Sequence, residues 1–447
     1  MSSAYEARDS ASGSYFARLG EARGSETAVI ATWPIKRLRF VTRINPSRRE
    51  REVILGDIKV TFLPMEAIHE NGTIDLNRVK PAADVESGYT YFRDGDVLVA
   101  KITPCFENGK GAVANGLAGG FGFGTTELTV LRPQDGLDRR FLRYVTVSHE
   151  FRKRGEGNMF GTGGQKRVPD TYFKDFPIAL PPRETQMAIV MFLDKKLAFI
   201  DALIAKKERL IDLLQEKCTA LINRVVTRGL DPNAPLRDSG FPWQPFIPSN
   251  WQIVRNRFLF RERDERGFPE LPILEVSIHT GVTIRAFSGT QIEQRSDDLS
   301  AYKRALKGDI VFNKMRMWQG AVGVAPIDGL VSPDYTVATV NEDRLDPHYF
   351  VALCRTEGYR LEINRHSHGI VDDRNRLYWD GFADIATFIP PRDQQVHIVR
   401  HFETASSRIN EVASRIASGI EKMKEYRTAL ISAAVTGKIN CEAALER

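Results

Sequence analysis

The chain contains one segment twice, and this repeat constrains its fold more than any other feature. Pro181-Pro182-Arg183-Glu184-Thr185-Gln186 returns as Pro390-Pro391-Arg392-Asp393-Gln394-Gln395, so residue 181 aligns with residue 390 at an offset of 209. The same offset aligns Thr219-Ala220-Leu221-Ile222 with Thr428-Ala429-Leu430-Ile431. About 45 residues therefore repeat without a gap, which predicts two copies of one structural unit.

Each repeated segment has the pattern of a long amphipathic helix. It begins after a Pro-Pro pair, which favours an extended entry into a helix. Apolar residues then recur in alternating steps of four and three, which places them on one stripe, as in a coiled-coil seam. Lys207 interrupts the first stripe and Arg427 interrupts the second. The apolar seam residues are Leu193, Leu197, Ile200, Ile204, Ile211, Leu214, Leu221, Ile409, Ile416, Ile420, Met423 and Leu430.

The two helices could each pack on their own domain, as a single amphipathic helix usually does, or they could pair. A 3.5-residue period kept over about 40 residues in both copies, roughly 60 Å of helix, favours a coiled coil. Because a whole domain separates the helices in the chain, they have room to pair antiparallel within one molecule. That pairing would form a rigid spacer with a globular domain at each end.

The segments outside the helices are predicted to be two mixed α/β domains. Short β-type runs such as 97–102 alternate with glycine-rich turns, and helices are expected around 139–153 and 347–358. Gly95-Asp96-Val97-Leu98 resembles Gly308-Asp309-Ile310-Val311, so the repeat extends loosely into the domains. We therefore expect the α/β class: two mixed α/β domains and two long helices paired as an antiparallel coiled coil, related by a pseudo-twofold internal repeat.

The expected boundaries follow from these patterns. The junction 227–248 is rich in Pro, Gly, Asp and Asn, which is typical of a linker. The boundaries are a flexible N-terminal tail 1–30, a first domain 31–182, a central spacer helix 183–230, a second domain with its entry linker 231–391, a distal spacer helix 392–438 and a C-terminal tail 439–447.

Composition narrows the function classes. The 447 residues include 63 Lys and Arg against 57 Asp and Glu, and the net charge of +6 permits a polyanionic partner without requiring one. No apolar run reaches about 18 residues and no apolar signal segment opens the chain, so neither a membrane span nor secretion is expected. Cys105, Cys218, Cys354 and Cys441 are far apart, which argues against a disulfide framework or cysteine zinc site and favours the cytoplasm.

Three motifs imitate catalytic sites and are rejected. The glycine-rich stretch 157–166 ends in Lys but lacks the Gly-Lys-Ser/Thr ending of a P-loop. Pro169-Asp170 followed by Asp194-x-Lys196 imitates a nuclease pattern, but the second element belongs to the heptad helix. His366-x-His368 lacks a nearby cysteine cluster that would complete a metal site. Because no Asn/Asp-Pro-Pro-aromatic methyltransferase motif occurs either, we expect neither catalysis nor a bound metal in this chain.

Four stretches of the sequence match one family. They are 95–105 with 107–110, 312–320 with 332–335, 238–251, and the doubled Pro-Pro-Arg-Glu/Asp-x-Gln helix start. Duplicated and in order, they make the chain resemble the specificity subunit of type I restriction-modification systems over nearly its whole length from about Trp33.

The resemblance implies a function as well as a fold. In that family, two target-recognition domains each read one half of a bipartite site in double-stranded DNA, and the paired helices set the gap. The helices also dock two modification (methyltransferase) subunits, which bind S-adenosylmethionine and methylate adenine. Restriction (translocase/endonuclease) subunits can join, and they use ATP and Mg. No cofactor is then expected in this chain itself.

DNA binding requires Lys and Arg for phosphates and loop side chains that reach base edges. The glycines of the loop 161–167 allow close backbone approach, and Gln165 could read adenine, although the loop could equally be a solvated turn. Trp318 is equally compatible with a core position. The candidate DNA-binding residues are Lys101, Lys110, Arg152, Arg154, Gln165, Lys166, Arg167, Lys314, Arg316, Trp318, Gln319, Arg365, Arg374 and Arg376.

The sequence leaves three hypotheses of function. The leading hypothesis is a non-catalytic DNA-recognition subunit of a methyltransferase/endonuclease complex. The first alternative is a self-acting nuclease or methyltransferase, for which a catalytic motif would be needed. The second is a coiled-coil scaffold without DNA specificity, which would behave independently of salt, whereas DNA binding weakens steeply with salt.

Overall fold

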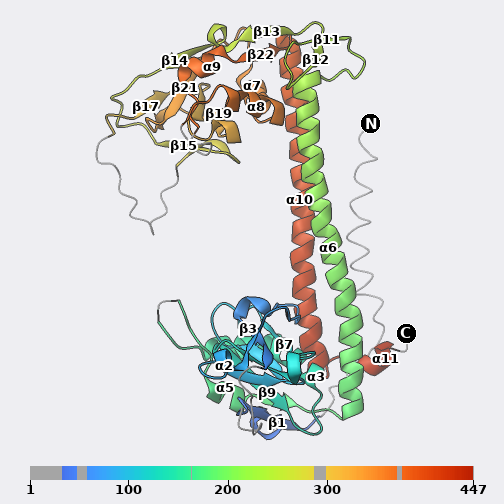
Figure 1. The fold of residues 1–447 in the computed structure, drawn as a ribbon. Coiled ribbons are helices and arrows are strands. Elements are labelled where there is room, and N and C mark those ends of the chain that lie inside the picture. The colour runs from blue at the N-terminus through green and yellow to red at the C-terminus, as the bar shows by residue number, and fades with distance from the viewer. Residues whose placement is uncertain (1–32, 48–57, 163, 286–298, 370–374, 446–447) are drawn as a thin grey trace. The chain divides into compact units, whose positions relative to one another are not determined.

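The computed structural model describes residues 33–47, 58–162, 164–285, 299–369 and 375–445 (Figure 1). The tail expected over 1–30 and the candidate Arg374 lie outside the described residues. The chain divides into two compact units. The first unit comprises Met1–Lys207 with Ser418–Arg447 and the second comprises Glu208–Ala417, so each unit includes one segment of each long helix.

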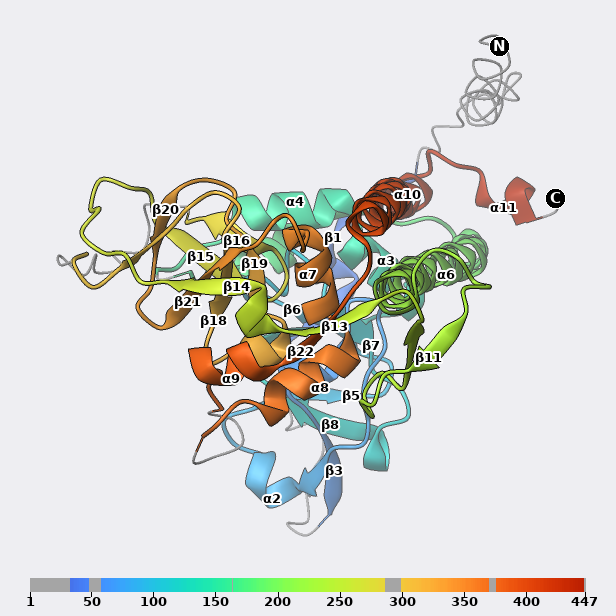
Figure 2. The same ribbon diagram turned by 90° about the horizontal axis from the view of Figure 1, so that it is seen from above.

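The two long helices that the repeat predicts are present and pack together within each unit. α6 covers Arg183–Arg228 and α10 covers Arg392–Val435, and Figure 2 shows them as neighbours. All twelve of the predicted seam residues are buried or half-buried, while the residues between them are mostly exposed. The burial therefore follows the period of four and three in the sequence. No helix of the described residues carries an apolar stretch of the length that a bilayer requires.

Side-chain contacts give the direction of the helix segments. In the second unit, Cys218 Sγ lies 3.3 Å from Ser406 Oγ, and Val225 shares a core cluster with Ile398. The numbering rises along one segment as it falls along the other, so the segments run antiparallel. In the first unit, an ion pair between the side chains of residues 427 and 201 joins the other two segments, at 3.1 Å.

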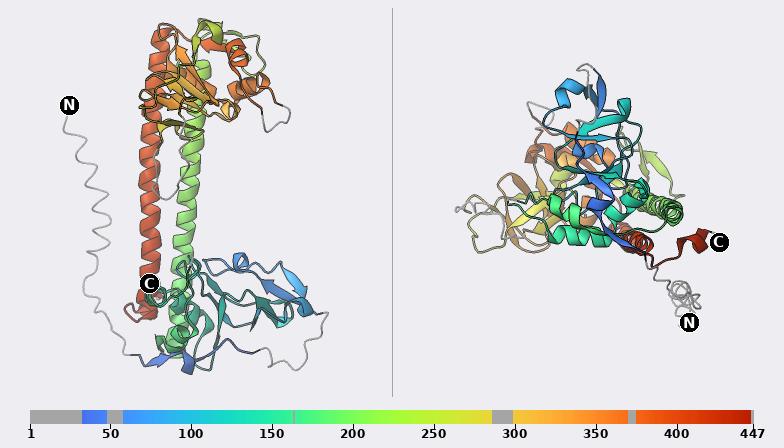
Figure 3. Two further views of the ribbon diagram at one scale, coloured as in Figure 1. Left: turned by 90° about the vertical axis from the view of Figure 1, so that its left-hand side faces the viewer. Right: turned by 90° about the horizontal axis from the view of Figure 1, so that it is seen from below.

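The first unit contains two four-stranded sheets and the small β1-β10 sheet, which lie to one side of its helix segments (Figure 3). One four-stranded sheet is antiparallel in the order β2-β9-β6-β7, and the other has the order β4-β3-β8-β5 with β3 parallel to β8. The strands are β1 (Ile35–Arg37), β2 (Thr42–Ile44), β3 (Lys59–Leu63), β4 (Val79–Pro81), β5 (Thr90–Arg93), β6 (Val97–Ala100), β7 (Gly111–Val113), β8 (Phe121–Gly124), β9 (Leu128–Pro133) and β10 (Pro177–Ala179). The helices are α2 (Ala82–Val85), α3 (Arg139–Val147), α4 (His149–Gly157), α5 (Asp170–Asp175), α11 (Cys441–Leu445) and the short 3-10 helices η1 (Leu38–Phe40), η3 (Met65–Ala67) and η4 (Ala118–Gly120).

The second unit repeats the antiparallel sheet in the order β14-β21-β18-β19. It also repeats the pairing of its first strand with its last, because β13 pairs with β22 as β1 pairs with β10. The strands are β11 (Leu236–Asp238), β12 (Phe246–Pro248), β13 (Gln252–Arg255), β14 (Phe260–Arg263), β15 (Leu274–Ser277), β16 (Gly281–Ile284), β17 (Lys303–Ala305), β18 (Ile310–Asn313), β19 (Val322–Val324), β20 (Gly329–Val331), β21 (Tyr335–Val340) and β22 (Ala386–Ile389). The helices are α7 (Pro347–Cys354), α8 (Glu357–Arg365), α9 (Trp379–Asp384), η5 (Asn256–Phe258) and η6 (Met317–Gln319).

Three local expectations differ from the structure. The single helix expected around 139–153 is two helices, because Ser148 adopts extended backbone angles and its hydroxyl accepts a hydrogen bond from the first turn of α4. Thr356 divides the expected helix around 347–358 in the same way. The linker expected over 227–248 contains the β11–β12 hairpin, because its turn residues bring two short strands together.

The repeated glutamine of the Pro-Pro-Arg segment joins each long helix to the domain that precedes it. Gln186 is fully buried: its Oε1 accepts from Asp138 N at 2.8 Å, and its Nε2 donates to the carbonyls of residues 136 and 181. Gln395 repeats this arrangement with Asp346 N and the carbonyls of residues 344 and 390. One amide therefore satisfies three main-chain groups in each unit, which explains why the repeat includes this residue.

Candidate nucleic-acid interface

Both units place a lysine where the central strand leaves its sheet. Lys101 follows β6 and Lys314 follows β18. The carbonyl of each lysine accepts a hydrogen bond from the segment that precedes α5 or α9: Val168 N donates to Lys101 O at 2.8 Å, and Leu377 N donates to Lys314 O at 2.9 Å. The internal repeat therefore extends from the helices and sheets into these loops.

In the second unit, main-chain and side-chain contacts bring four of the predicted residues together. This second-unit patch contains Lys314, Arg316, Trp318 and Arg376. Trp318 Nε1 donates to Met315 O at 3.0 Å, and Arg376 Nη2 lies 3.7 Å from Met315 Sδ. Arg360 of α8 fixes the η6 turn by donating from Nε to Trp318 O at 3.0 Å. A set of residues separated by about 60 positions in sequence thus forms one surface.

The cations of the second-unit patch differ in what they bind within the fold. Arg316 is exposed, and its guanidinium makes no hydrogen bond or ion pair among the described residues. Lys314 Nζ donates to Pro333 O at 3.3 Å, and burial, with the nearby Lys303, lowers its pKa. Trp318 is half-buried against the core cluster, which agrees with its alternative interpretation as a packing residue. Of these side chains, Arg316 is the best placed for a phosphate.

The glycine-rich loop of the first unit is held by its own main chain. Gly161 has φ +140, and a Cβ there would lie 2.6 Å from Gln165 O, so only glycine allows this close approach. Arg167 makes a two-point contact with Glu127, at 2.8 and 2.9 Å, which raises the pKa of the guanidinium. Gln165 and Lys166 remain exposed. They are the side chains of this loop that are best placed to reach a partner.

Three other predicted residues of the first unit are engaged within the fold. Lys110 Nζ and Arg152 Nη1 donate to main-chain carbonyls at 3.0 and 2.7 Å, and both side chains are half-buried. Burial, with Arg427, lowers the pKa of Arg152. Arg154 is exposed and pairs with Glu150 at 2.6 Å. The two carbonyl contacts are structural, so Lys110 and Arg152 are weaker candidates for DNA contact than the sequence suggested.

A pocket that no sequence pattern indicated lies beside Lys101. It has a volume of about 380 Å³, and its wall includes Asn45, Tyr89 and Tyr91. Tyr89 is 41% exposed, so an aromatic ring, an amide and a lysine face the same space. These residues come from three separate segments, and only the strand pairing brings them together.

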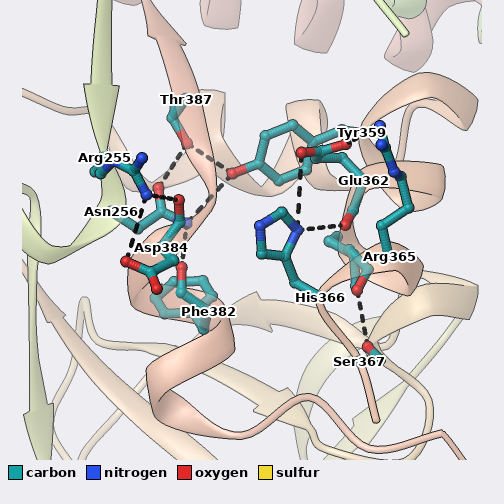
Figure 4. Close-up of polar contacts among 11 residues, drawn as sticks. Arg255, Asn256, Tyr359, Glu362, Arg365, His366, Ser367, Phe382, Asp384 and Thr387 are labelled. Atoms are coloured by element: carbon teal, nitrogen blue, oxygen red, sulfur yellow. Dashed lines mark hydrogen bonds and ion pairs between the residues drawn. The ribbon is translucent and has the colours of Figure 1, made fainter. Parts of the chain in front are cut away.

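A buried polar network joins α8 to the neighbouring elements (Figure 4). Asn256 Nδ2 donates to Phe382 O at 3.0 Å, and its Oδ1 accepts from Thr387 Oγ1 at 2.6 Å. The Tyr359 hydroxyl lies 2.6 Å from the same threonine oxygen. These contacts join α8 to β22 and η5, so they fix the position of α8 in the second unit.

The His366-x-His368 motif has structural partners on α8. His366 Nδ1 lies 3.0 Å from Glu362 O and 3.7 Å from Glu362 Oε1, and Arg365 binds the same carboxylate at 3.3 Å (Figure 4). His368 pairs with Arg376 through main-chain hydrogen bonds. No group of three or more potential metal ligands occurs among the described residues. Arg365 extends from the turn with 65% of its side chain exposed, despite the ion pair.

Comparisons with known proteins support the family resemblance. No protein-family model matches the sequence. The type I restriction enzyme EcoAI specificity subunit of Escherichia coli is 37% identical over 193 residues, which are 42% of this chain. The match spans about a third of the relative's length, 32%.

Two solved structures share the fold. The HsdS subunit from Thermoanaerobacter tengcongensis superposes with a TM-score of 0.53 at 16% identity, over 92% of this chain and 98% of that one. A chain from a study of complex assembly and conformational transition in the type I R-M system gives a TM-score of 0.63 at 17% identity, over 91% and 98%. In fold, and in sequence over 42% of its length, the chain is therefore similar to specificity subunits of type I restriction-modification systems.

Proposed function

We propose that this chain is a non-catalytic DNA-recognition subunit of a type I restriction-modification complex, with one domain reading each half of a bipartite DNA site. The observation that carries the proposal is the duplication of one loop arrangement. In each unit, a lysine follows the central strand, and its main chain pairs with a segment that contains an arginine. Lys101 pairs with the segment at Arg167, and Lys314 pairs with the segment at Arg376. Two copies of one potential reading surface in a single chain favour a target in two parts.

The charges of these surfaces suit a phosphate backbone. Exposed Lys166 lies in the first unit, and Arg316 and Arg376 lie in the second. Lys and Arg supply the sequence-independent part of DNA binding, while amides such as Gln165 can make two hydrogen bonds to adenine. The first unit thus offers both a cation for phosphates and an amide for base edges, and the second unit offers two exposed cations.

We further propose that α6 and α10 act as a spacer and as the docking surface for two modification subunits. Eight exposed large hydrophobic side chains on the two helices lie off the seam, which is expected of a surface that a partner covers. They are Met187, Met191, Phe199, Leu210, Leu213, Val396, Val412 and Tyr426. Under this proposal, S-adenosylmethionine would act in the modification subunits, and ATP with Mg would act in restriction subunits. We propose no cofactor chemistry for this chain.

The experiment that tests the function is methylome sequencing. The chain is expressed with its cognate modification subunit in a host that lacks other adenine methyltransferases. We expect methyladenine in both halves of a bipartite motif. Absence of new methylation, with the complex shown to be intact and loaded with cofactor, would contradict the proposal.

Loop exchange in one unit sharpens the test. Replacing residues 314–319 by an unrelated loop of equal length should alter or abolish the half-site that the second unit reads and leave the other half unchanged. An equal replacement of 161–167 should affect the opposite half. A change in both halves after either exchange would show that the units do not read separately.

The spacer role predicts a length dependence. Deleting 207–213 from α6 and 413–419 from α10 removes one heptad from each helix and keeps the seam in register. Seven residues correspond to roughly 10 Å, or about three base pairs at 3.4 Å each. We expect the gap between half-sites to shorten by about this number, and an unchanged gap would contradict the role.

A further inference from the structure

The first unit contains a pocket that the proposed DNA surfaces do not use. Its volume is about 770 Å³, and its walls come from α3, α6, α10 and the loops at 70–72 and 107–109. This volume lies within the range of small-molecule sites, roughly 300–1,000 Å³. All of these walls belong to the first unit.

Arg143 lines this pocket as a buried charge without a carboxylate partner. The residue is 9% exposed, and its Nη2 donates to Gly109 O at 3.2 Å and to Glu70 O at 3.4 Å. Its Nε and Nη1 are buried and have no hydrogen-bond acceptor among the described residues. Since a buried charged donor without an acceptor is strongly unfavourable, the fold alone does not account for this guanidinium.

The carboxylates of the pocket are occupied by other groups. Asp194 accepts from Arg140 and Tyr144, at 3.0 and 2.5 Å. The pocket's Asp201 and Glu70 accept from residues 427 and 108. Burial, and then the Arg427 charge, lower the pKa of Arg143 to about 9, so its surroundings stabilise the positive charge poorly.

One acceptor in the pocket also lacks a partner. Glu107 lines the pocket, and its buried Oε2 has no donor among the described residues. A ligand that satisfied both groups would carry an oxyanion together with a hydroxyl or amino group.

The second unit repeats the fold of the first without the charges of Arg143 and Arg427. The capping residues Asp138 and Asp346 align α3 with α7 at an offset of 208, which places Val351 where the first unit has Arg143. The offset of 209 between the long helices places Cys218 where the first unit has Arg427. The second unit therefore has an uncharged residue at both equivalent positions.

Arg152, by contrast, has a counterpart in the second unit. The offset of 208 aligns it with Arg360, and both guanidinium groups donate to main-chain carbonyls. This arginine therefore belongs to the shared fold. Arg143 and Arg427 are additions to one copy.

We infer that this pocket is a binding site for the phosphate group of a small phosphorylated molecule, such as a nucleoside monophosphate, with Arg143 and Arg427 binding the oxyanion. A phosphate accepts several charge-assisted hydrogen bonds at once, which suits two guanidinium groups better than a single carboxylate does. Glu107 accepts from a hydroxyl or amino group of the same molecule. The remaining volume accommodates a base and a sugar.

The test measures binding of inorganic phosphate and of a nucleoside monophosphate to the full chain by calorimetry, with ionic strength held constant with chloride. The variant Arg143→Val introduces the residue that the second unit holds at this position. We expect saturable binding to the unaltered chain, and at least tenfold weaker binding to Arg143→Val. Arg78→Val is the matched control, because Arg78 is exposed, pairs with Glu66 and lies outside the pocket.

A second variant keeps the test decisive if Arg143→Val does not fold. Arg427→Cys also introduces the residue of the second unit, and it should weaken phosphate binding by a similar factor. Equal binding by all variants, or no binding to the unaltered chain, would overturn the inference. The variants could instead lose binding to DNA or to the modification subunit while the unaltered chain binds no phosphate. That result would identify the pocket as a contact with a macromolecule, and it would also overturn the inference.

Discussion

The two units form an equivalent ion pair from different strands, fully buried in the first unit and partly buried in the second. In the first unit, Asp96 pairs with Arg132 of β9, at 2.7 Å. In the second, the equivalent Asp309 pairs with Arg263 of β14, at 2.8 Å, while Thr339 occupies the position of Arg132. The shared requirement is a guanidinium beside the Gly-Asp turn, and either neighbouring strand can supply it. What the repeat retains is thus the interaction, not the residue that makes it.

The largest expected effect comes from breaking this pair in one unit. Arg132→Thr introduces the residue of the second unit but leaves Asp96 buried without its partner, which should cost about 3–5 kcal/mol of unfolding free energy. Urea unfolding of the full chain, with hydrogen exchange to locate the loss, measures it. Arg78→Thr breaks an exposed pair as the control and should cost at most about 1 kcal/mol. A loss of under 1 kcal/mol for Arg132→Thr would show that the pair does not stabilise the first unit.

Removing the repeated glutamine should affect both units alike. Gln186→Ala and Gln395→Ala each leave three main-chain groups without a partner, and each should cost about 2–4 kcal/mol. The same unfolding measurement applies. Gln215→Ala, on the exposed face of α6, is the control and should be close to neutral. Costs that differ by more than about 2 kcal/mol between the two units would mean that the joints are not equivalent.

Exchanging Arg143 and Val351 tests the largest difference between the units. Without phosphate, Arg143→Val should stabilise the first unit by about 1–3 kcal/mol, since it removes an unpaired buried charge. Val351→Arg should destabilise the second unit by a similar amount. Thermal unfolding in phosphate-free buffer measures both. Destabilisation by Arg143→Val would mean that the guanidinium makes favourable contacts in the empty pocket.

The smallest expected effects concern the exposed cations. Arg316→Ala and Lys166→Ala should each lower the salt dependence of DNA binding by the complex by about one unit of log–log slope. DNA affinity measured between 50 and 200 mM salt, on the order of physiological strength, gives the slope. Arg415→Ala, which breaks an exposed ion pair on α10, is the control and should leave the slope unchanged. An unchanged slope in either variant would remove that residue from the interface.

The long helices were the most predictable part of the fold. Their seam depends on spacing within one segment, so Leu193 and Leu197 reveal their buried face without knowledge of any partner. The expected bounds 183–230 and 392–438 lie within three residues of α6 and α10 at their ends. The helix break at Ser148 was missed, since Ser is also common on helix surfaces and its capping role depends on backbone angles.

The surface residues were less predictable. Sequence alone identifies Arg152 and Arg316 equally as cations, but folding gives one of them a main-chain acceptor and leaves the other exposed. Arg143 was missed because a lone arginine in an amphipathic helix resembles a solvated residue. Its significance emerges only from the tertiary structure, where its neighbours fail to neutralise it, and from the comparison with Val351.

The glutamine joint has a consequence for how such chains can diversify. Gln186 and Gln395 bind only main-chain atoms of the domains that they hold. These hydrogen bonds do not depend on the side chains of the domain, so the sequence of a domain can change without a compensating change in the helix. The two copies already illustrate this freedom, because their helices align at the single offset of 209. The offsets of their domains vary from 207, between Arg132 and Thr339, to 218, between Trp33 and Trp251. A different domain would need only a main chain that passes the same point.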